Sequence, residues 1–89
     1  MVQIHFIYSE NCKHCQQALA TIESAIKKCK NIPCEIKKYI YNNPIAISIA
    51  INNNINDLPG FVVGNTVFMG DDYDEKKIIK AIEDKDMNR

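Results

Sequence analysis

The chain has 89 residues, of which 46% are hydrophobic and 25% charged, and this composition predicts one globular domain over residues 1–89. Eleven basic residues balance eleven acidic ones, so there is no electrostatic reason to expect a nucleic acid or a membrane surface as partner. No apolar run approaches the ~20 residues of a membrane span, and residues 1–5 lack the features of a signal peptide. We therefore expect a cytoplasmic monomer.

A buried strand over residues 2–8 is predicted from the apolar run that ends at Tyr8. A helix over residues 12–30 follows, and Asn31-Ile32-Pro33 ends it. Apolar residues recur at three- and four-residue steps along this helix: Cys15, Ala18, Leu19, Ile22, Ile26 and Cys29.

Two cysteines lie at the turn between this strand and this helix, in the motif Cys12-Lys13-His14-Cys15. A helix N-terminus favours a thiolate over a thiol, because its N–H groups are unpaired and its dipole end is positive. Cysteines three residues apart on such a turn can form a disulfide, as a reversible dithiol–disulfide couple requires. We expect Cys12, the more exposed thiol, to be the nucleophile and Cys15, on the apolar face, to be the resolving thiol.

The segment after the predicted second strand, residues 34–40, allows two interpretations. Large and small residues alternate over residues 45–51, which on period alone indicates a strand. However, Asn42 or Asn43 is a good N-cap, and Pro44 suits the first helical position. Asn residues 52–54 suit the end of a helix, so we predict a short helix here.

Two short strands, residues 61–63 and 66–68, are predicted around the hairpin turn Gly64-Asn65. Asp72 or Asp74 then caps a last helix, whose apolar stripe contains Ile78, Ile79 and Ile82. The predicted order of elements is β-α-β-α-β-β-α, an α/β fold.

This order, with a CxxC after the first strand, resembles the thioredoxin superfamily, and the length resembles its minimal, glutaredoxin-like members. The resemblance implies a central four-stranded mixed sheet flanked by three helices. Pro59 matches the family's cis-proline beside the active site. The resemblance therefore implies that the main chain of Leu58 binds substrate by strand-like pairing.

Other family motifs are altered in this chain. Asp57-Leu58-Pro59 stands where glutaredoxins often carry Thr-Val-Pro, and Met69-Gly70-Asp71-Asp72 half-matches their Gly-Gly-acidic motif. Residues 8–11 contain no lysine, although glutathione-binding members commonly have one just before the first cysteine. Glutathione and a reductase enzyme therefore both stay open as the electron donor.

Four further residues are candidates at the site. His14 is expected to stabilise the thiolate and so make the disulfide more oxidising, and Lys13 adds positive charge. Tyr8 is a candidate to pack beside the cysteines, or simply to fill the core at the strand end. Asp71 is a candidate contact for a substrate amine, although helix capping explains it as well.

The leading hypothesis is a thiol–disulfide oxidoreductase acting on protein disulfides or glutathione mixed disulfides, with no bound cofactor and no metal. Metal or iron–sulfur binding through the cysteines is one alternative, and a non-catalytic binding module is another. Cys29 and Cys34 are expected to be buried hydrophobic residues, with a second disulfide disfavoured in a reducing cytosol.

Overall fold

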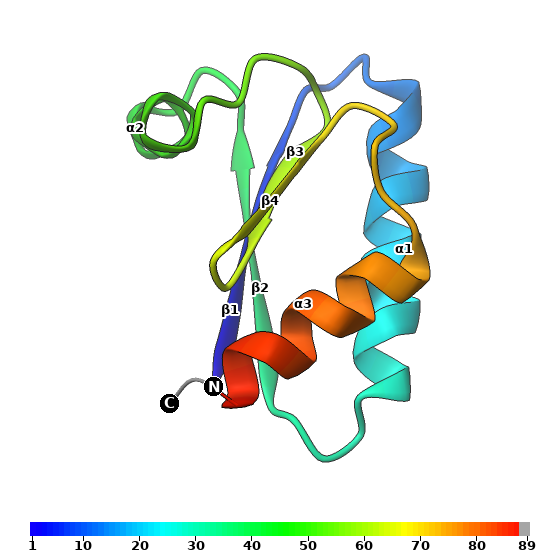
Figure 1. Cartoon of the computed structure of the whole chain (residues 1–89). Coiled ribbons are helices and arrows are strands. Elements are labelled where there is room, and N and C mark those ends of the chain that lie inside the picture. The colour runs from blue at the N-terminus through cyan, green and yellow to red at the C-terminus, as the bar shows by residue number, and fades with distance from the viewer. Residues whose placement is uncertain (88–89) are drawn as a thin grey trace.

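The computed structural model describes residues 1–87 as one sheet with helices on both faces (Figure 1). The strands are β1 (Val2–Tyr8), β2 (Cys34–Ile40), β3 (Gly60–Val63) and β4 (Thr66–Met69). The helices are α1 (Lys13–Lys28), α2 (Pro44–Asn53) and α3 (Glu75–Met87). The observed order of elements is the predicted one.

The sheet is mixed and has the strand order β2-β1-β3-β4. β1 runs parallel to β2, with Val2 opposite Cys34, and antiparallel to β3, with Phe6 opposite Phe61. The parallel pair with α1 between its strands is a βαβ unit, and β3 and β4 form an antiparallel hairpin. This arrangement confirms the predicted α/β fold.

The main core lies between the sheet and the two helices α1 and α3, which cover one of its faces (Figure 1). Alternate residues of β1 point into this core, because successive side chains of a strand face opposite sides. The buried residues are Val2, Ile4 and Phe6 from β1, Cys15, Ala18, Ile22 and Ala25 from α1, Cys29 just after it, Phe61, Val63 and Phe68 from the hairpin, and Ile78, Ala81 and Ile82 from α3.

Helix α1 is shorter than the predicted span of residues 12–30. Cys12 is its N-cap, and Cys29 takes a non-helical backbone at the C-cap, with its N–H donating to the carbonyls of Ala25 and Ile26. The chain therefore leaves the helix at Cys29, ahead of the Asn31-Ile32-Pro33 turn. The predicted apolar stripe is confirmed, and Ala25 joins it.

Helix α2 forms where the sequence pattern allowed a strand. The Asn43 side chain accepts a hydrogen bond from the Ile45 N–H at 2.8 Å, Pro44 opens the helix, and Asn54 ends it in the left-handed conformation, at φ 56°. These local caps prevail over the alternation of large and small residues. Of the α2 residues only Ala46 is buried.

No helix in the described chain is long and apolar enough to cross a membrane.

The hairpin and the last helix are close to prediction. Gly64-Asn65 is the two-residue turn, and Gly64 has a φ of 61°. Each strand is one residue longer than predicted, because Gly60 pairs with Met69. Asp74, rather than Asp72, caps α3, since its carboxylate accepts from the Lys77 N–H at 2.8 Å.

Candidate active site

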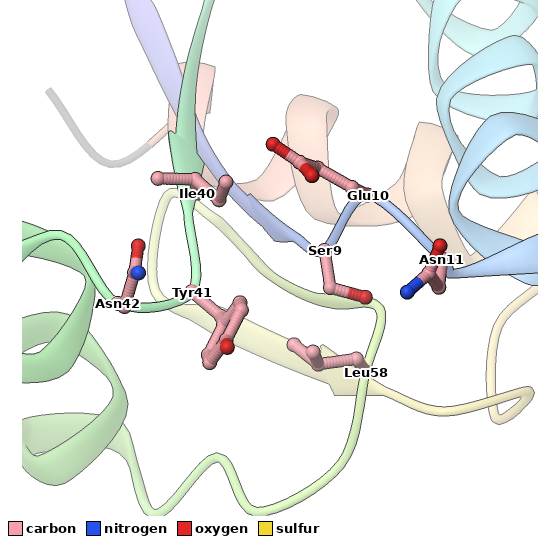
Figure 2. Close-up of a pocket in the computed structure, with 7 residues that line it drawn as sticks. All are labelled: Ser9, Glu10, Asn11, Ile40, Tyr41, Asn42 and Leu58. Carbon is pink, nitrogen blue, oxygen red and sulfur yellow. The ribbon is translucent and has the colours of Figure 1, made fainter.

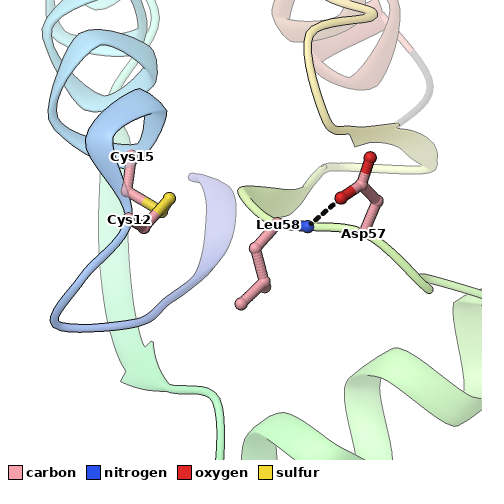
Figure 3. Close-up of a disulfide and its surroundings, with 4 residues drawn as sticks. All are labelled: Cys12, Cys15, Asp57 and Leu58. Atoms are coloured by element: carbon pink, nitrogen blue, oxygen red, sulfur yellow. Dashed lines mark hydrogen bonds between the residues drawn. A yellow bond between two sulfur atoms is a disulfide. The ribbon is translucent and has the colours of Figure 1, made fainter.

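Cys12 and Cys15 are joined by a disulfide where β1 leads into α1, with their Cα atoms 5.3 Å apart (Figure 3). Residues 9–11 make the connection from the end of β1, and Cys12 is the N-cap of the helix. Cys12 is half-buried, whereas Cys15, one turn further on, is 5% exposed. Cys12 is therefore the more exposed of the two thiols, as predicted, and its role as the nucleophile stays a prediction.

The start of α1 favours negative charge on Cys12. An N-cap side chain normally accepts a hydrogen bond from an N–H of the first turn, but Cys12 makes no such bond in the disulfide. The first turn contains no acidic residue, and it carries Lys13 and His14, both exposed. Once the disulfide is opened, the Cys12 sulfur lies at the positive end of the helix with these N–H groups unclaimed.

Tyr8 lies beside the cysteines and also packs against the core, so it combines the two placements predicted for it. It is half-buried and stacks on Phe6, with the ring centres 6.5 Å apart. A hollow of about 310 Å³ is lined by Tyr8 together with Cys12 and Cys15. Tyr8 therefore forms part of the wall next to the disulfide.

The Leu58-Pro59 loop lies next to the disulfide on the side away from α1 (Figure 3). The peptide bond between Leu58 and Pro59 is cis, as the resemblance implied. Pro59 is fully buried, and its carbonyl accepts from the Gly70 N–H at 2.8 Å, which ties the loop to the end of β4. Leu58 is only half-buried and so is available to contact a substrate.

Asp57 is a residue of the site that the sequence analysis did not select. Its carboxylate accepts a hydrogen bond from the Leu58 N–H at 2.9 Å (Figure 3). It also packs against Gly70, whose φ is 61°. A Cβ atom at position 70 would lie 2.6 Å from the Asp57 Oδ2. The signal in the sequence was Asp57 directly before Leu58, because Asp side chains bond to nearby backbone N–H groups.

A second hollow, of about 430 Å³, lies between the active-site loop and the turn after β2 (Figure 2). Figure 2 shows the side chains of Tyr41 and Leu58 pointing toward one another across it. It is lined by Ser9, Glu10, Asn11, Ile40, Tyr41, Asn42 and Leu58. Of these residues only Leu58 was predicted as part of the site, because β1 and β2 bring the others together from separate parts of the chain.

Asp71 lines none of the hollows that are lined by the cysteines or by Leu58. It lies in the loop between β4 and α3, is exposed, and interacts with Tyr73. Burial, and to a smaller extent the Asp71 carboxylate, raise the pKa of Tyr73. The proposed contact of Asp71 with a substrate amine stays a prediction.

The other two cysteines lie at the far end of α1, which at 16 residues is about 24 Å long. Both are free: Cys29 is buried, and Cys34 is half-buried, with its thiol donating to the Ile32 carbonyl at 3.5 Å. Burial raises the pKa of both thiols. Among the described residues, no group of three or more His, Cys, Asp or Glu side chains is placed to hold a metal ion.

A mixed sheet with α1 and α3 on one face, a CxxC at the start of α1 and a cis-proline beside it define a thioredoxin-like protein. A family model described as a thioredoxin domain matches residues 2–83, and the chain belongs to this family. No curated protein matches the sequence.

Two solved structures share the fold. One, titled as the structure of a malarial protein, is 15% identical, has a TM-score of 0.63, and the match covers 96% of this chain and 97% of that one. The other contains the first two thioredoxin domains of Saccharomyces cerevisiae Eps1p, at 17% identity and a TM-score of 0.60. That match covers 98% of this chain and 36% of the two-domain chain. The family and the paired cysteines together support a redox-type function.

Proposed function

We propose that the protein is a thiol–disulfide oxidoreductase that acts on protein disulfides or on mixed disulfides of glutathione. The observation that carries this proposal is the Cys12–Cys15 disulfide, with Cys12 half-exposed at the N-cap of α1 and Cys15 buried behind it. This arrangement supplies a nucleophile with a stabilised thiolate and a second thiol within bonding reach.

The reaction is a sequence of two exchanges. The Cys12 thiolate attacks one sulfur of the target disulfide, the bond between the target sulfurs breaks, and the leaving thiolate takes a proton from solvent. Cys15 then loses its proton to solvent and attacks the Cys12 sulfur as a thiolate, which forms the Cys12–Cys15 disulfide and releases the second target sulfur as a thiolate that takes up a proton. Two electrons pass to the target. In the reducing cytoplasm that the sequence predicts, glutathione or a reductase enzyme returns the pair to the dithiol.

The Leu58-Pro59 loop is proposed to align the target chain. Leu58 is half-buried beside the disulfide, and main-chain pairing at this residue would hold a substrate strand next to Cys12. The Leu58 N–H is already bonded to the Asp57 carboxylate, so a substrate that pairs here competes with that carboxylate.

The test is a redox titration of the protein in glutathione buffers, with alkylation and mass spectrometry to identify which cysteines protect each other. We expect Cys12 and Cys15 to pair reversibly, Cys12→Ser to abolish reduction of a small disulfide, and Cys15→Ser to accumulate a mixed disulfide at Cys12. Cys34→Ser is the matched control and is expected to keep full activity. Full activity in Cys12→Ser would show that this mechanism is wrong.

A further inference from the structure

Two thiols that the proposed mechanism does not use lie at the end of α1 that is far from the active site. Cys29 is the C-cap of α1 and is 8% exposed, and Cys34 is the first residue of β2 and is half-buried. Both are free thiols, Cys29 within the core and Cys34 packed against it. Only the short connection of residues 30–33 separates them in the chain (Figure 1).

The fold places the two cysteine side chains in the same layer of the molecule. Cys34 stands opposite Val2 in the parallel pairing of β2 with β1, so these two side chains point to the same face of the sheet. Val2 belongs to the core that Cys29 also lines, on the face that α1 and α3 cover (Figure 1). The side chain of Cys34 therefore lies in the layer that also contains Cys29.

The connection between the two cysteines folds back on itself. The Ile32 N–H donates to the Cys29 carbonyl at 3.0 Å, and the Cys34 thiol donates to the Ile32 carbonyl at 3.5 Å. The Pro33 carbonyl accepts from the Val2 N–H at 2.9 Å, which ties the turn to β1. Burial raises the pKa of Cys34, and negative charge on Cys29 raises it further, so the two thiols are close enough to interact.

We propose that Cys29 and Cys34 form a second redox-active dithiol, which oxidised glutathione converts to a disulfide across this turn. Cys34, the more exposed thiol, loses its proton to solvent and attacks one sulfur of oxidised glutathione. The bond between the glutathione sulfurs breaks, and one glutathione leaves as a thiolate that takes up a proton. Cys29 then loses its proton to solvent and attacks the Cys34 sulfur, which forms the Cys29–Cys34 disulfide and releases the second glutathione as a thiolate that takes up a proton. Two electrons pass from the pair to glutathione.

The surroundings of this pair make it slower to react than the active-site pair. Burial, and to a smaller extent the Glu83 carboxylate, raise the pKa of Cys29. Burial and the charge of Cys29 raise the pKa of Cys34, the Asp86 carboxylate adds to the rise, and the N-terminal ammonium opposes it. Cys29 also lies at the negative end of α1, whereas the active-site pair lies at the positive end. Because the thiolate is the attacking species, the second pair stays a dithiol during brief oxidation and closes when oxidation lasts.

The proposed disulfide links the end of α1 to the start of β2. It closes a loop over residues 29–34 and so restricts the unfolded chain, which should raise the melting temperature by about 10 °C. Formation of the second disulfide is therefore visible in the stability of the protein as well as in its mass.

The experiment uses the full chain with Cys12→Ser and Cys15→Ser together, which leaves Cys29 and Cys34 as the only thiols. The protein is incubated in buffers with decreasing ratios of reduced to oxidised glutathione, quenched with acid, alkylated in urea and analysed by intact mass. We expect the two thiols to lose their alkylation together, without a lasting glutathione adduct, and the melting temperature to rise. The matched control also carries Cys34→Ser, and it is expected to form no internal disulfide and to keep its melting temperature.

Three outcomes would each overturn the inference: a lasting glutathione adduct at Cys34, a disulfide between two chains, or two thiols that stay reduced in an excess of oxidised glutathione. In wild type, the Cys12–Cys15 disulfide should form at least about tenfold faster than the second one, and equal rates would overturn the role of the second pair as a slow sensor. The variant lacks both active-site cysteines, so its result does not depend on the proposed function. Failure of wild type to reduce a small disulfide would refute that function and leave this inference standing.

Discussion

At the residue scale, Asp57 gives the site a property that a simple dithiol pair lacks. Its carboxylate binds the N–H of Leu58 and packs against Gly70, so it brings negative charge to the loop beside the disulfide. A negative charge at this place repels an anionic disulfide and leaves an uncharged one unaffected. Asp57 therefore bears on whether glutathione is a good partner.

We predict that Asp57→Asn reacts a few times faster than wild type with oxidised glutathione, which is anionic, because it removes the charge and keeps an acceptor for the Leu58 N–H. The rate with 2-hydroxyethyl disulfide should change little. The measurement is the single-turnover rate of the reduced protein at low and high salt, since salt screens the repulsion in wild type. An equal change with both disulfides would mean that the charge of Asp57 has no part in selection.

His14 is predicted to set the midpoint of the couple. It lies in the first turn of α1 together with Lys13, and both are exposed. Replacing His14 by Ala should make the midpoint more negative by about 20–40 mV, because the thiolate loses a stabilising neighbour. Lys13→Ala, on the same turn, should shift it less, since a flexible exposed ammonium is well hydrated. Glutathione titrations of wild type, His14→Ala and Lys13→Ala measure the midpoints. Equal midpoints would show that His14 does not set the midpoint of the couple.

Single residues were predictable from sequence where the chemistry is local. Cys12 and Cys15 are three residues apart on one turn, and Pro59 follows Leu58 in a recognisable motif. Tyr41 was not predictable, because it reaches the active-site loop only through the pairing of β1 with β2. The bond between Asp57 and Leu58 depends on the backbone of the loop, which no sequence period describes.

At the scale of elements, α1 and α3 are joined by a polar contact at the start of α3. The Glu75 carboxylate accepts from the Lys28 ammonium at 2.8 Å and also from the Ser24 hydroxyl. The side-chain hydrogen bonds with Lys28 and Ser24 hold the pKa of Glu75 below its ordinary value. The contact links the two helices that lie on the same face of the sheet (Figure 1).

This lowered pKa predicts how stability depends on pH. A carboxyl with a lower pKa in the folded than in the unfolded state contributes stability above its ordinary pKa, and loses it as the pH falls through the folded value. Glu75→Gln should therefore lower the melting temperature by a few degrees near neutral pH. The difference from wild type should shrink as the pH falls below about 4.5.

Glu23→Gln is the control, because Glu23 is an exposed carboxyl on α1 outside the contact with Glu75. It should leave the melting temperature unchanged at both pH values. Thermal melts followed by circular dichroism give the comparison, and a Glu75→Gln difference that stays constant on acidification would contradict the prediction.

Elements were predicted best where caps and period agree. α1 and α3 have apolar stripes of helical period, and both formed as expected. Helix α2 was decided by Asn43 and Pro44 against its alternating pattern. The helix that these caps fix leaves Ile45, Ile47 and Ile51 in solvent.

At the scale of the whole molecule, the disulfide lies at one end of the core and the centre of the core lies further along α1. Ile22 is fully buried in the core against the sheet, two turns along α1 from Cys15. Ile22→Ala should cost about 2–5 kcal/mol of unfolding free energy, because it removes buried methyl groups and leaves a cavity. The midpoint of the Cys12–Cys15 couple should stay at its wild-type value.

Urea unfolding of the oxidised protein measures the unfolding free energy. Glutathione titration at a temperature where the variant is folded measures the midpoint of the Cys12–Cys15 couple. A shifted midpoint in folded Ile22→Ala would show that packing in the centre of α1 is coupled to the disulfide. Ile51→Ala, at an exposed apolar position of α2, is the control and should change stability by less than about 0.5 kcal/mol.

The architecture was predictable because the N-terminal and C-terminal halves of the chain each have their own sequence pattern. A strand, a helix and a strand in series predict a parallel pair, and Gly64-Asn65 predicts the hairpin. Which face each helix covers was not predictable, because α1 and α3 both carry apolar stripes and the apolar residues of α2 do not form one distinct face. The exposure of Ile45, Ile47 and Ile51 follows from that placement, so it emerged only from the structure.

The position of β1 between β2 and β3 also decides when the site comes into existence during synthesis. Cys12 and Cys15 leave the ribosome early and can join α1 and the β1–β2 pair as soon as residue 40 is free. Leu58 and Pro59 reach the cysteines only when β3 docks on the other edge of β1. A growing chain therefore carries both thiols of the proposed dithiol pair before the loop that we propose aligns a substrate has docked beside them.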